Sequence, residues 1–215
     1  MAQSNRIVHL AGSTLNCSCH ACAFFYSREE EERILLPFVK EGIEAGDKFF
    51  HVLNSEYEPT RRRSLLDCGI NVARAEQISQ IEMRSWEQAY LRSGRFDQNA
   101  MLDLIQRVLA EGKQQGFGLT RLWANMEWAL EELPGVHDIV EYEARLNQVL
   151  PKYDDVVVCT YDITKFSAAV VMDILRTHPE VIIGGTLQKN PFYVPPEEFL
   201  QELQTRDQES IESVS

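Results

Sequence analysis

The chain has 215 residues, of which 44% are hydrophobic, and it carries 33 acidic against 21 basic side chains for a formal charge of −12. This length suits one domain with a substantial core, and the acidic balance argues against direct binding to nucleic acid or to an anionic membrane surface. Its longest apolar runs are strand-sized, no signal-peptide pattern opens the chain and the five cysteines are an odd number, which together predict a cytoplasmic protein with reduced thiols.

The first quarter of the chain predicts strand, helix and strand. A buried-strand run at residues 21–26 precedes Ser27 and Glu30, which have the spacing of a capping box. In the helix that follows, Pro37 predicts a kink or a fresh start, and the apolar stripe consists of Leu35, Val39 and Ile43. The next strand is expected at residues 48–53.

The second quarter predicts two more helices and a short strand. A helix that starts at Glu58 and Pro59 is expected to bury Leu65 and Leu66 and to end at Gly69 in the left-handed conformation. A strand is predicted at residues 80–84. The clearest helical periodicity covers residues 97–115, where one buried face consists of Met101, Leu102, Ile105, Val108 and Leu109.

The second half continues the alternation. Strands are predicted at 121–128, 156–161 and 181–183, and helices at 136–150, at 165–175 and from Pro195 and Pro196 to Leu203. Six strands separated by helical segments imply right-handed crossovers. The expected fold is α/β, with a mostly parallel central sheet and helices on both faces.

Several short segments together carry a family resemblance. They are His20-Ala-Cys22-Ala-Phe-Phe, Leu36 to Gly42, Phe96-Asp97, Met126-Glu127-Trp128-Ala-Leu, Tyr142 to Asn147, Cys159-Thr-Tyr161-Asp162 and His178-Pro179 through Asn190-Pro-Phe. With these segments, residues 18–204 resemble the MEDS sensory domain, named from methanogen and methylotroph regulators including the dichloromethane regulator. Residues 1–17 are then an N-terminal extension, and residues 205–215 are expected to form a disordered acidic tail.

The resemblance implies a RecA/KaiC-like three-layer sandwich that senses a small hydrocarbon or one-carbon derivative in prokaryotic signal transduction or transcriptional control. Relatives often fuse the domain to an output module, for which this chain has no room, so a separate signalling or regulatory protein is the expected partner. Self-association into a homo-oligomer is compatible with this reading.

Catalysis on nucleotides is not expected. The chain contains no G-x-x-x-x-G-K-[ST] phosphate loop, and the corresponding strand-to-helix junction carries the four carboxylates of residues 29–32. Those carboxylates are interpreted as a solvated helix start that repels phosphate. No nucleophile elbow or triad signature is present either, so the protein is predicted not to be an enzyme.

A ligand pocket is predicted where Glu127 and Trp128 end a strand, because ligands of open α/β sheets bind at the carboxyl ends of the strands. The other candidate binding residues are His20, Cys22, Tyr142, Arg145 and His178. A structural pairing of Glu127 with Trp128, and a surface ion pair of Arg145 with Glu141, remain open alternatives.

A soft metal such as zinc is a second hypothesis, although no cofactor is the primary expectation. Its candidate ligands are Cys17, Cys19, His20 and Cys22, with His51 on the next strand nearby. The spacing lacks the paired C-x-x-C pattern, and Cys22 also suits an ordinary buried position. A metal or redox sensor, a ligand-free docking scaffold and a nucleotide-related enzyme are therefore the alternatives to a small-molecule sensor.

Overall fold

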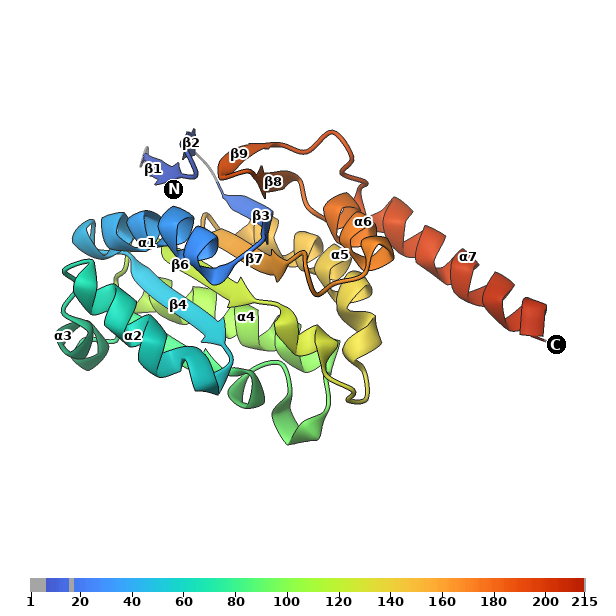
Figure 1. The fold of residues 1–215 in the computed structure, drawn as a ribbon, viewed down its shortest axis with the longest axis horizontal. Coiled ribbons are helices and arrows are strands. Elements are labelled where there is room, and N and C mark those ends of the chain that lie inside the picture. Colours follow the sequence, from blue (N-terminus) through green and yellow to red (C-terminus); the bar gives the residue numbers. More distant parts are fainter. Residues whose placement is uncertain (1–6, 16–17, 215) are drawn as a thin grey trace.

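A computed structural model of the chain describes residues 7–15 and 18–214, and its centre is a seven-stranded sheet between helices (Figure 1). Six strands run parallel and the edge strand β9 is antiparallel to its neighbour, which confirms the predicted α/β fold. In spatial order the strands are β5 (Ile81–Ser85), β4 (Lys48–Leu53), β6 (Thr120–Asn125), β7 (Val156–Asp162), β3 (Cys19–Phe25), β8 (Glu180–Ile183) and β9 (Thr186–Lys189).

Helices cover both faces of the sheet. One layer consists of α1 (Arg28–Glu44), α2 (Glu58–Asp67) and α3 (Val72–Gln77), and the other of α4 (Gln98–Gln114), α5 (Ile139–Val149) and α6 (Ala168–Thr177). The central strands are buried along almost their whole length, as strands covered on two faces are. Because successive side chains alternate, each strand contributes to two separate cores.

The chain ends add two elements that the periodicity did not predict. Strands β1 (Val8–Leu10) and β2 (Ser13–Leu15) form a hairpin inside the expected extension, and Val8 and Leu10 are buried in the core on the α1 side. The hairpin also bonds to β9, since the Leu187 amide donates to the Ala11 carbonyl. The described part of the extension is therefore folded against the domain.

The C-terminal segment is a helix. Helix α7 (Pro196–Val214) lies against α5 and projects away from the sheet (Figure 1). The expected disordered tail over residues 205–215 is therefore helical as far as Val214. Helix α7 projects from the domain, so only its first turns contact the core, where Phe199 is buried. The rest of the helix can therefore be polar and charged.

Three local predictions were wrong. Helix α1 continues through Pro37, so the predicted fresh start does not occur, since packing of the buried face outweighs the lost backbone donor. In α2, Leu65 is buried but Leu66 is exposed, because adjacent helical positions lie about 100° apart. Strand β6 ends at Asn125, so Glu127 and Trp128 belong to a following 3₁₀ turn (Glu127–Leu130) instead of the strand.

A buried arginine joins α1 to the sheet. The Arg121 guanidinium donates to Asp47 at 2.8 Å, to the Phe38 carbonyl at 2.7 Å and to Glu41 at 3.1 Å. It lies so close to α1 that a Cβ atom at Gly42 would approach the Arg121 Cδ and Nε atoms to 2.5 Å. Because Gly42 has no side chain, the ion-paired Arg121 side chain can occupy this space.

We predict that Gly42→Ala lowers the free energy of unfolding by about 1–3 kcal/mol, because the new methyl group displaces a side chain fixed by three partners. Replacing glycine by alanine would by itself stabilise a helix interior by about 1 kcal/mol, so the steric clash has to outweigh this gain. Urea unfolding followed by tryptophan fluorescence measures it. Glu44→Ala, at an exposed position of the same helix, is the matched control, and equal stability of the two variants would contradict the prediction.

Candidate functional site

Four side chains meet between the sheet and the helices α5 and α6. We call them the polar centre: His20, Glu143, Cys159 and His178. Strand β3 supplies His20, the neighbouring strand β7 supplies Cys159, α5 supplies Glu143, and His178 follows the last residue of α6. One ligand-type atom from each lies within 4.8 Å of the others. All four residues are buried, Glu143 and His178 completely.

Hydrogen bonds orient the two histidines and the glutamate of the polar centre. Nδ1 of His20 lies 2.8 Å from Asn147 Oδ1, and Nδ1 of His178 lies 2.8 Å from the Ile174 carbonyl oxygen. The Tyr161 hydroxyl donates to Glu143 Oε1 at 2.7 Å. The Nε2 atoms of both imidazoles and the free carboxylate oxygen therefore face one another.

The buried carboxylate sets the charge of the polar centre. Burial alone would raise the pKa of Glu143, but His178 and His20 beside it hold that pKa well below its usual range. Burial, and then Glu143, raise the pKa of the Cys159 thiol. Burial lowers the pKa of His178. Burial therefore opposes the charged forms of the Cys159 thiol and of His178, whereas the two imidazoles favour the ionised form of Glu143.

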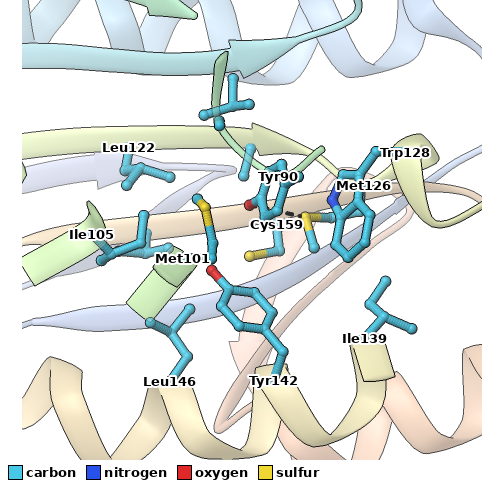
Figure 2. Packing of buried hydrophobic residues seen from close by; sticks show 14 of the residues in the cluster. Tyr90, Met101, Ile105, Leu122, Met126, Trp128, Ile139, Tyr142, Leu146 and Cys159 are labelled. Atoms are coloured by element: carbon cyan, nitrogen blue, oxygen red, sulfur yellow. Dashed lines mark hydrogen bonds between the residues drawn. The ribbon is translucent and has the colours of Figure 1, made fainter. Parts of the chain in front are cut away.

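Four aromatic side chains pack beside the polar centre, and we call them the aromatic box: Tyr90, Phe96, Trp128 and Tyr142. Figure 2 shows Tyr90, Trp128 and Tyr142. The Trp128 ring stacks on Tyr90 with centroids 4.5 Å apart and lies 4.3 Å from Phe96. Tyr142 meets Phe96 edge-on. Within the described residues, the buried Trp128 Nε1 has no hydrogen-bond partner, which is unusual for an indole in a core.

Cys159 links the aromatic box to the polar centre. In Figure 2 it lies next to Tyr90, Met126 and Tyr142, and its Sγ atom is 3.7 Å from His20 Nε2 and 3.8 Å from Glu143 Oε2. Burial, followed by neighbouring groups that include Glu143 and Cys159, raises the pKa of Tyr142. The two groups form one continuous candidate site with a polar end and an aromatic end.

The sequence predicted half of this site. His20, Trp128, Tyr142 and His178 come together as expected, and Cys22 lies on the same face of β3, in register with Cys159. Glu143, Cys159, Tyr90 and Phe96 were missed as site residues, and so was Tyr161, which donates a hydrogen bond to Glu143. The signal for Cys159 and Tyr161 was their alternation on a strand parallel to the one that carries His20 and Cys22.

Glu127 lies outside this site. Its carboxylate pairs with Lys165 at 2.6 Å and with Arg28 at 3.3 Å, and the Asn125 amide donates to it at 3.4 Å. Because β6 ends before residue 127, the side chain turns toward the start of α1 and away from the box that Trp128 enters. These contacts favour a structural role for Glu127, but with Arg28 and Lys165 as its partners and not with Trp128 as expected.

Arg145 also lies apart from the site. It bonds Asn99 at 2.6 Å and pairs with Glu141 at 3.8 Å on the surface of α5. The proposed cysteine cluster is not formed as expected, because Cys19 and His20 are adjacent on a strand and face opposite layers. Cys17 lies outside the described residues.

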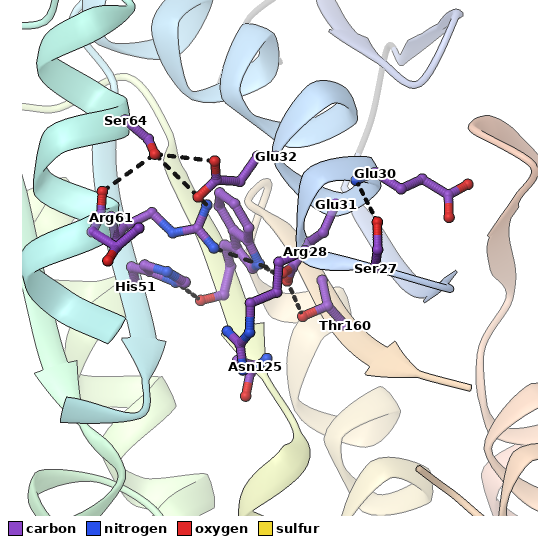
Figure 3. A network of polar contacts seen from close by, with 12 residues as sticks. Ser27, Arg28, Glu30, Glu31, Glu32, His51, Arg61, Ser64, Asn125 and Thr160 are labelled. Atoms are coloured by element: carbon purple, nitrogen blue, oxygen red, sulfur yellow. Dashed lines mark hydrogen bonds and ion pairs between the residues drawn. The ribbon is translucent and has the colours of Figure 1, made fainter. Parts of the chain in front are cut away.

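A second polar network occupies the other face of the sheet at the start of α1 (Figure 3). The buried Glu31 carboxylate accepts hydrogen bonds from Trp123 Nε1 at 2.9 Å and from Thr160 Oγ1 at 2.6 Å, and Arg61 lies 3.7 Å away. The predicted solvated run of carboxylates is therefore partly wrong, since Glu31 faces the core. His51 joins this network by a 2.7 Å contact to the Trp123 carbonyl.

Comparisons with known proteins agree with the fold. A family model described as "MEthanogen/methylotroph, DcmR Sensory domain" matches residues 19–179. The transcriptional repressor DcmR of Methylorubrum extorquens is 23% identical over 172 residues, which are 80% of this chain and 62% of the repressor. The chain therefore spans less than two thirds of that relative's length.

The fold is also that of a solved KaiC-like protein from Pyrococcus horikoshii. The two structures match with a TM-score of 0.56 at 17% identity, over 82% of this chain and 75% of the other. This likeness confirms the expected RecA/KaiC-like architecture. Among the described helices, none has an apolar stretch of the length that crossing a bilayer requires.

We predict that Glu127→Gln lowers the free energy of unfolding by about 1–2 kcal/mol, because the change removes the ion pairs with Arg28 and Lys165. The effect stays small because both pairs are partly exposed to solvent. Thermal and urea unfolding measure the effect. Glu131→Gln is the control, since Glu131 is an exposed carboxylate four positions along the chain. If Glu127→Gln is as stable as the wild type, the network does not hold this end of the sheet together.

A pH-dependent stability is expected from His51. Burial, and then Arg61, lower its pKa well below 6.5, so only the unfolded chain takes up this proton as the pH falls below about 6.5. The free energy of unfolding then decreases with falling pH, by up to about 1.4 kcal/mol per pH unit. We expect His51→Gln to remove this part of the slope and exposed His137→Gln to retain it. Identical slopes in all three proteins would refute the assignment.

Proposed function

This chain belongs to the MEDS family of sensory domains, and on that premise we propose that it senses a small molecule and relays the signal to transcriptional control. The observation that carries the proposal is the pairing of a buried polar centre with an aromatic box at one continuous site. Small-ligand sites combine a mainly apolar lining with a few placed polar groups. The arrangement therefore suits a ligand with a small apolar body and one polar group.

Within the ligand class expected of the family, we propose a short hydrocarbon or one-carbon derivative, because such a compound needs the least room among these closely packed rings. Tyr90, Phe96 and Trp128 offer their rings to the apolar part of the ligand. The Trp128 indole N–H, which has no partner in the described structure, is free to donate to the polar group. We therefore assign ligand recognition to the aromatic box and not to Glu127.

We place the entrance at the segment between β5 and α4. This segment contains two short 3₁₀ turns, Trp86–Gln88 and Arg92–Gly94, and Ser93 has a positive φ of 62°. An open hollow of about 290 Å³ lies against it, lined in part by Tyr90, Arg95 and Asp97. Because Tyr90 also belongs to the aromatic box, a ligand that shifts Tyr90 changes the surface that this segment presents.

The output is proposed to pass through a separate regulatory protein. A change at the β5–α4 segment alters an exposed surface, which a partner can read without any chemical step by this chain. We accordingly propose a non-catalytic domain. Two groups of contacts support this view. The carboxylates Glu31 and Glu32 at the start of α1 contact Arg61 and Ser64. Glu127 pairs with Arg28 and Lys165.

The test is a panel of methanol, formate, formaldehyde and dichloromethane. A cognate compound should raise the melting temperature with increasing concentration, since only the folded chain offers the site, and should change the tryptophan fluorescence. We expect Trp128→Phe to weaken its binding by about two- to tenfold through loss of one hydrogen bond. Arg145→Ala, on the surface of α5, should bind as the wild type does. Equal affinity of the Trp128→Phe variant would place the ligand elsewhere.

A further inference from the structure

The polar centre contains more acceptors than its own hydrogen bonds satisfy. His178 Nδ1 faces the Ile174 carbonyl, which only accepts, so Nδ1 carries the proton. The Asn147 amide N–H groups donate to the Glu143 and Thr177 carbonyls, so the Asn147 oxygen faces His20. Because that oxygen only accepts, His20 Nδ1 also carries a proton. In the neutral imidazoles both Nε2 lone pairs therefore point toward Glu143.

The two Nε2 atoms meet an oxygen that also carries lone pairs. Each lies 3.4 Å from Glu143 Oε2, and the fully buried His178 Nε2 makes no hydrogen bond of good geometry within the described residues. The basic groups paired with Glu143 in the described part of the chain are these two imidazoles. The Glu143 carboxylate has no exposed surface, so a positive charge between its Oε2 atom and the two Nε2 atoms is needed to compensate its negative charge.

The separations of these atoms fit a metal ion. Tetrahedral coordination with Zn–N and Zn–O bonds near 2.0–2.1 Å and a Zn–S bond near 2.3 Å separates N and O atoms by about 3.3 Å, and either from sulfur by about 3.6 Å. Four of the six separations are close to these values: Glu143 Oε2 lies 3.4 Å from each imidazole and 3.8 Å from Cys159 Sγ, and Sγ lies 3.7 Å from His20 Nε2. The other two, from His178 to His20 and to Cys159, are within 4.8 Å.

The hydrogen-bond partners of the two histidines and of Glu143 are those typical of a metal site. A metal-binding histidine usually donates its other ring N–H to an oxygen, and a metal-binding carboxylate is itself hydrogen-bonded. Asn147 and the Ile174 carbonyl serve the two histidines in this way, and the Tyr161 hydroxyl serves Glu143. The site thus has ligands of the right type, number and spacing, together with their supporting contacts.

We propose that His20, Glu143, Cys159 and His178 bind one divalent transition metal ion, for which the donor set and spacing fit Zn²⁺. Binding releases the Cys159 proton, and the thiolate and carboxylate together neutralise the ion. Four protein ligands leave no open position, so the ion has a structural or signalling role and activates no water. It joins β3, β7, α5 and the end of α6.

The proposal deepens the proposed function, because the metal occupies the polar end of the same site. Cys159 contacts both the polar centre and the aromatic box, so a ligand in the box borders the metal's thiolate. The metal experiments below contain no small molecule. Failure of the compound panel therefore leaves the metal proposal intact, and failure of metal binding leaves the aromatic box as a ligand site.

The first experiment measures metal in the wild-type chain, purified without chelator and without a metal-affinity tag. We expect close to one zinc per chain by plasma mass spectrometry, and a lower melting temperature after chelation that added Zn²⁺ restores. Replacement by Co²⁺ should give the intense visible absorption of a tetrahedral site and a thiolate-to-cobalt band in the near ultraviolet. These readouts need no variant to fold.

Variants then assign the ligands. Cys159→Ser should lose the thiolate band and bind Zn²⁺ more than about 100-fold more weakly. Mutation of a group that only hydrogen-bonds to a metal ligand already lowers metal affinity by about 10- to 100-fold. Asn147→Ala should weaken Zn²⁺ binding within that smaller range and retain the band. Cys22→Ser is the matched control, because Cys22 is a buried cysteine on the same face, in register with Cys159. It should bind as the wild type does.

Two results would overturn the proposal. One is a wild-type chain that takes up neither Zn²⁺ nor Co²⁺ at micromolar concentration. The other is a cobalt complex without the thiolate band, or one whose band survives in Cys159→Ser and disappears in Cys22→Ser. In the first case, protons on the imidazoles compensate Glu143, and the polar centre is a histidine–carboxylate cluster.

Discussion

A fully buried carboxylate determines how the α5–α6 side of this domain is built. Glu143 has no exposed surface, so the protein itself must replace the water that would solvate it. Four elements bring groups to it: β3, β7, α5 and the end of α6. The helix that carries Glu143 also carries Tyr142 and Asn147, so the same helix orients the aromatic box and one of the imidazoles.

The two faces of the sheet treat charge differently. On the α1 side, buried acids meet guanidinium groups: Asp47 pairs with Arg121, and Glu31 lies near Arg61, which stacks over Trp123 at 3.8 Å. On the α5 side, Glu143 meets imidazoles, a thiol and a phenol. Guanidinium groups stay charged at any working pH, so the ion pairs of the first face keep their charge, whereas the imidazoles and thiol around Glu143 can exchange protons or bind metal.

Periodicity sufficed for the architecture because long, regular elements report it directly. The helix of residues 98–114 and the apolar strand runs were identified from spacing alone. Boundaries failed where tertiary contacts decide them: β6 stops at Asn125, which moved Glu127 out of the pocket, and α1 passes Pro37. Glu143 was missed because a lone glutamate on an amphipathic helix resembles a surface residue, and only the packing of three other elements against it marks it as buried.

The strand at each edge of the sheet is protected from pairing with another chain. At one edge, β9 runs antiparallel to β8 and bonds the β1–β2 hairpin through Leu187. At the other edge, β5 carries Glu82 and Arg84, which pair with each other at 2.5 Å. Covered or charged edge strands resist the addition of a further strand. The fold itself therefore disfavours the addition of a strand from another copy of the chain at either edge of the seven-stranded sheet.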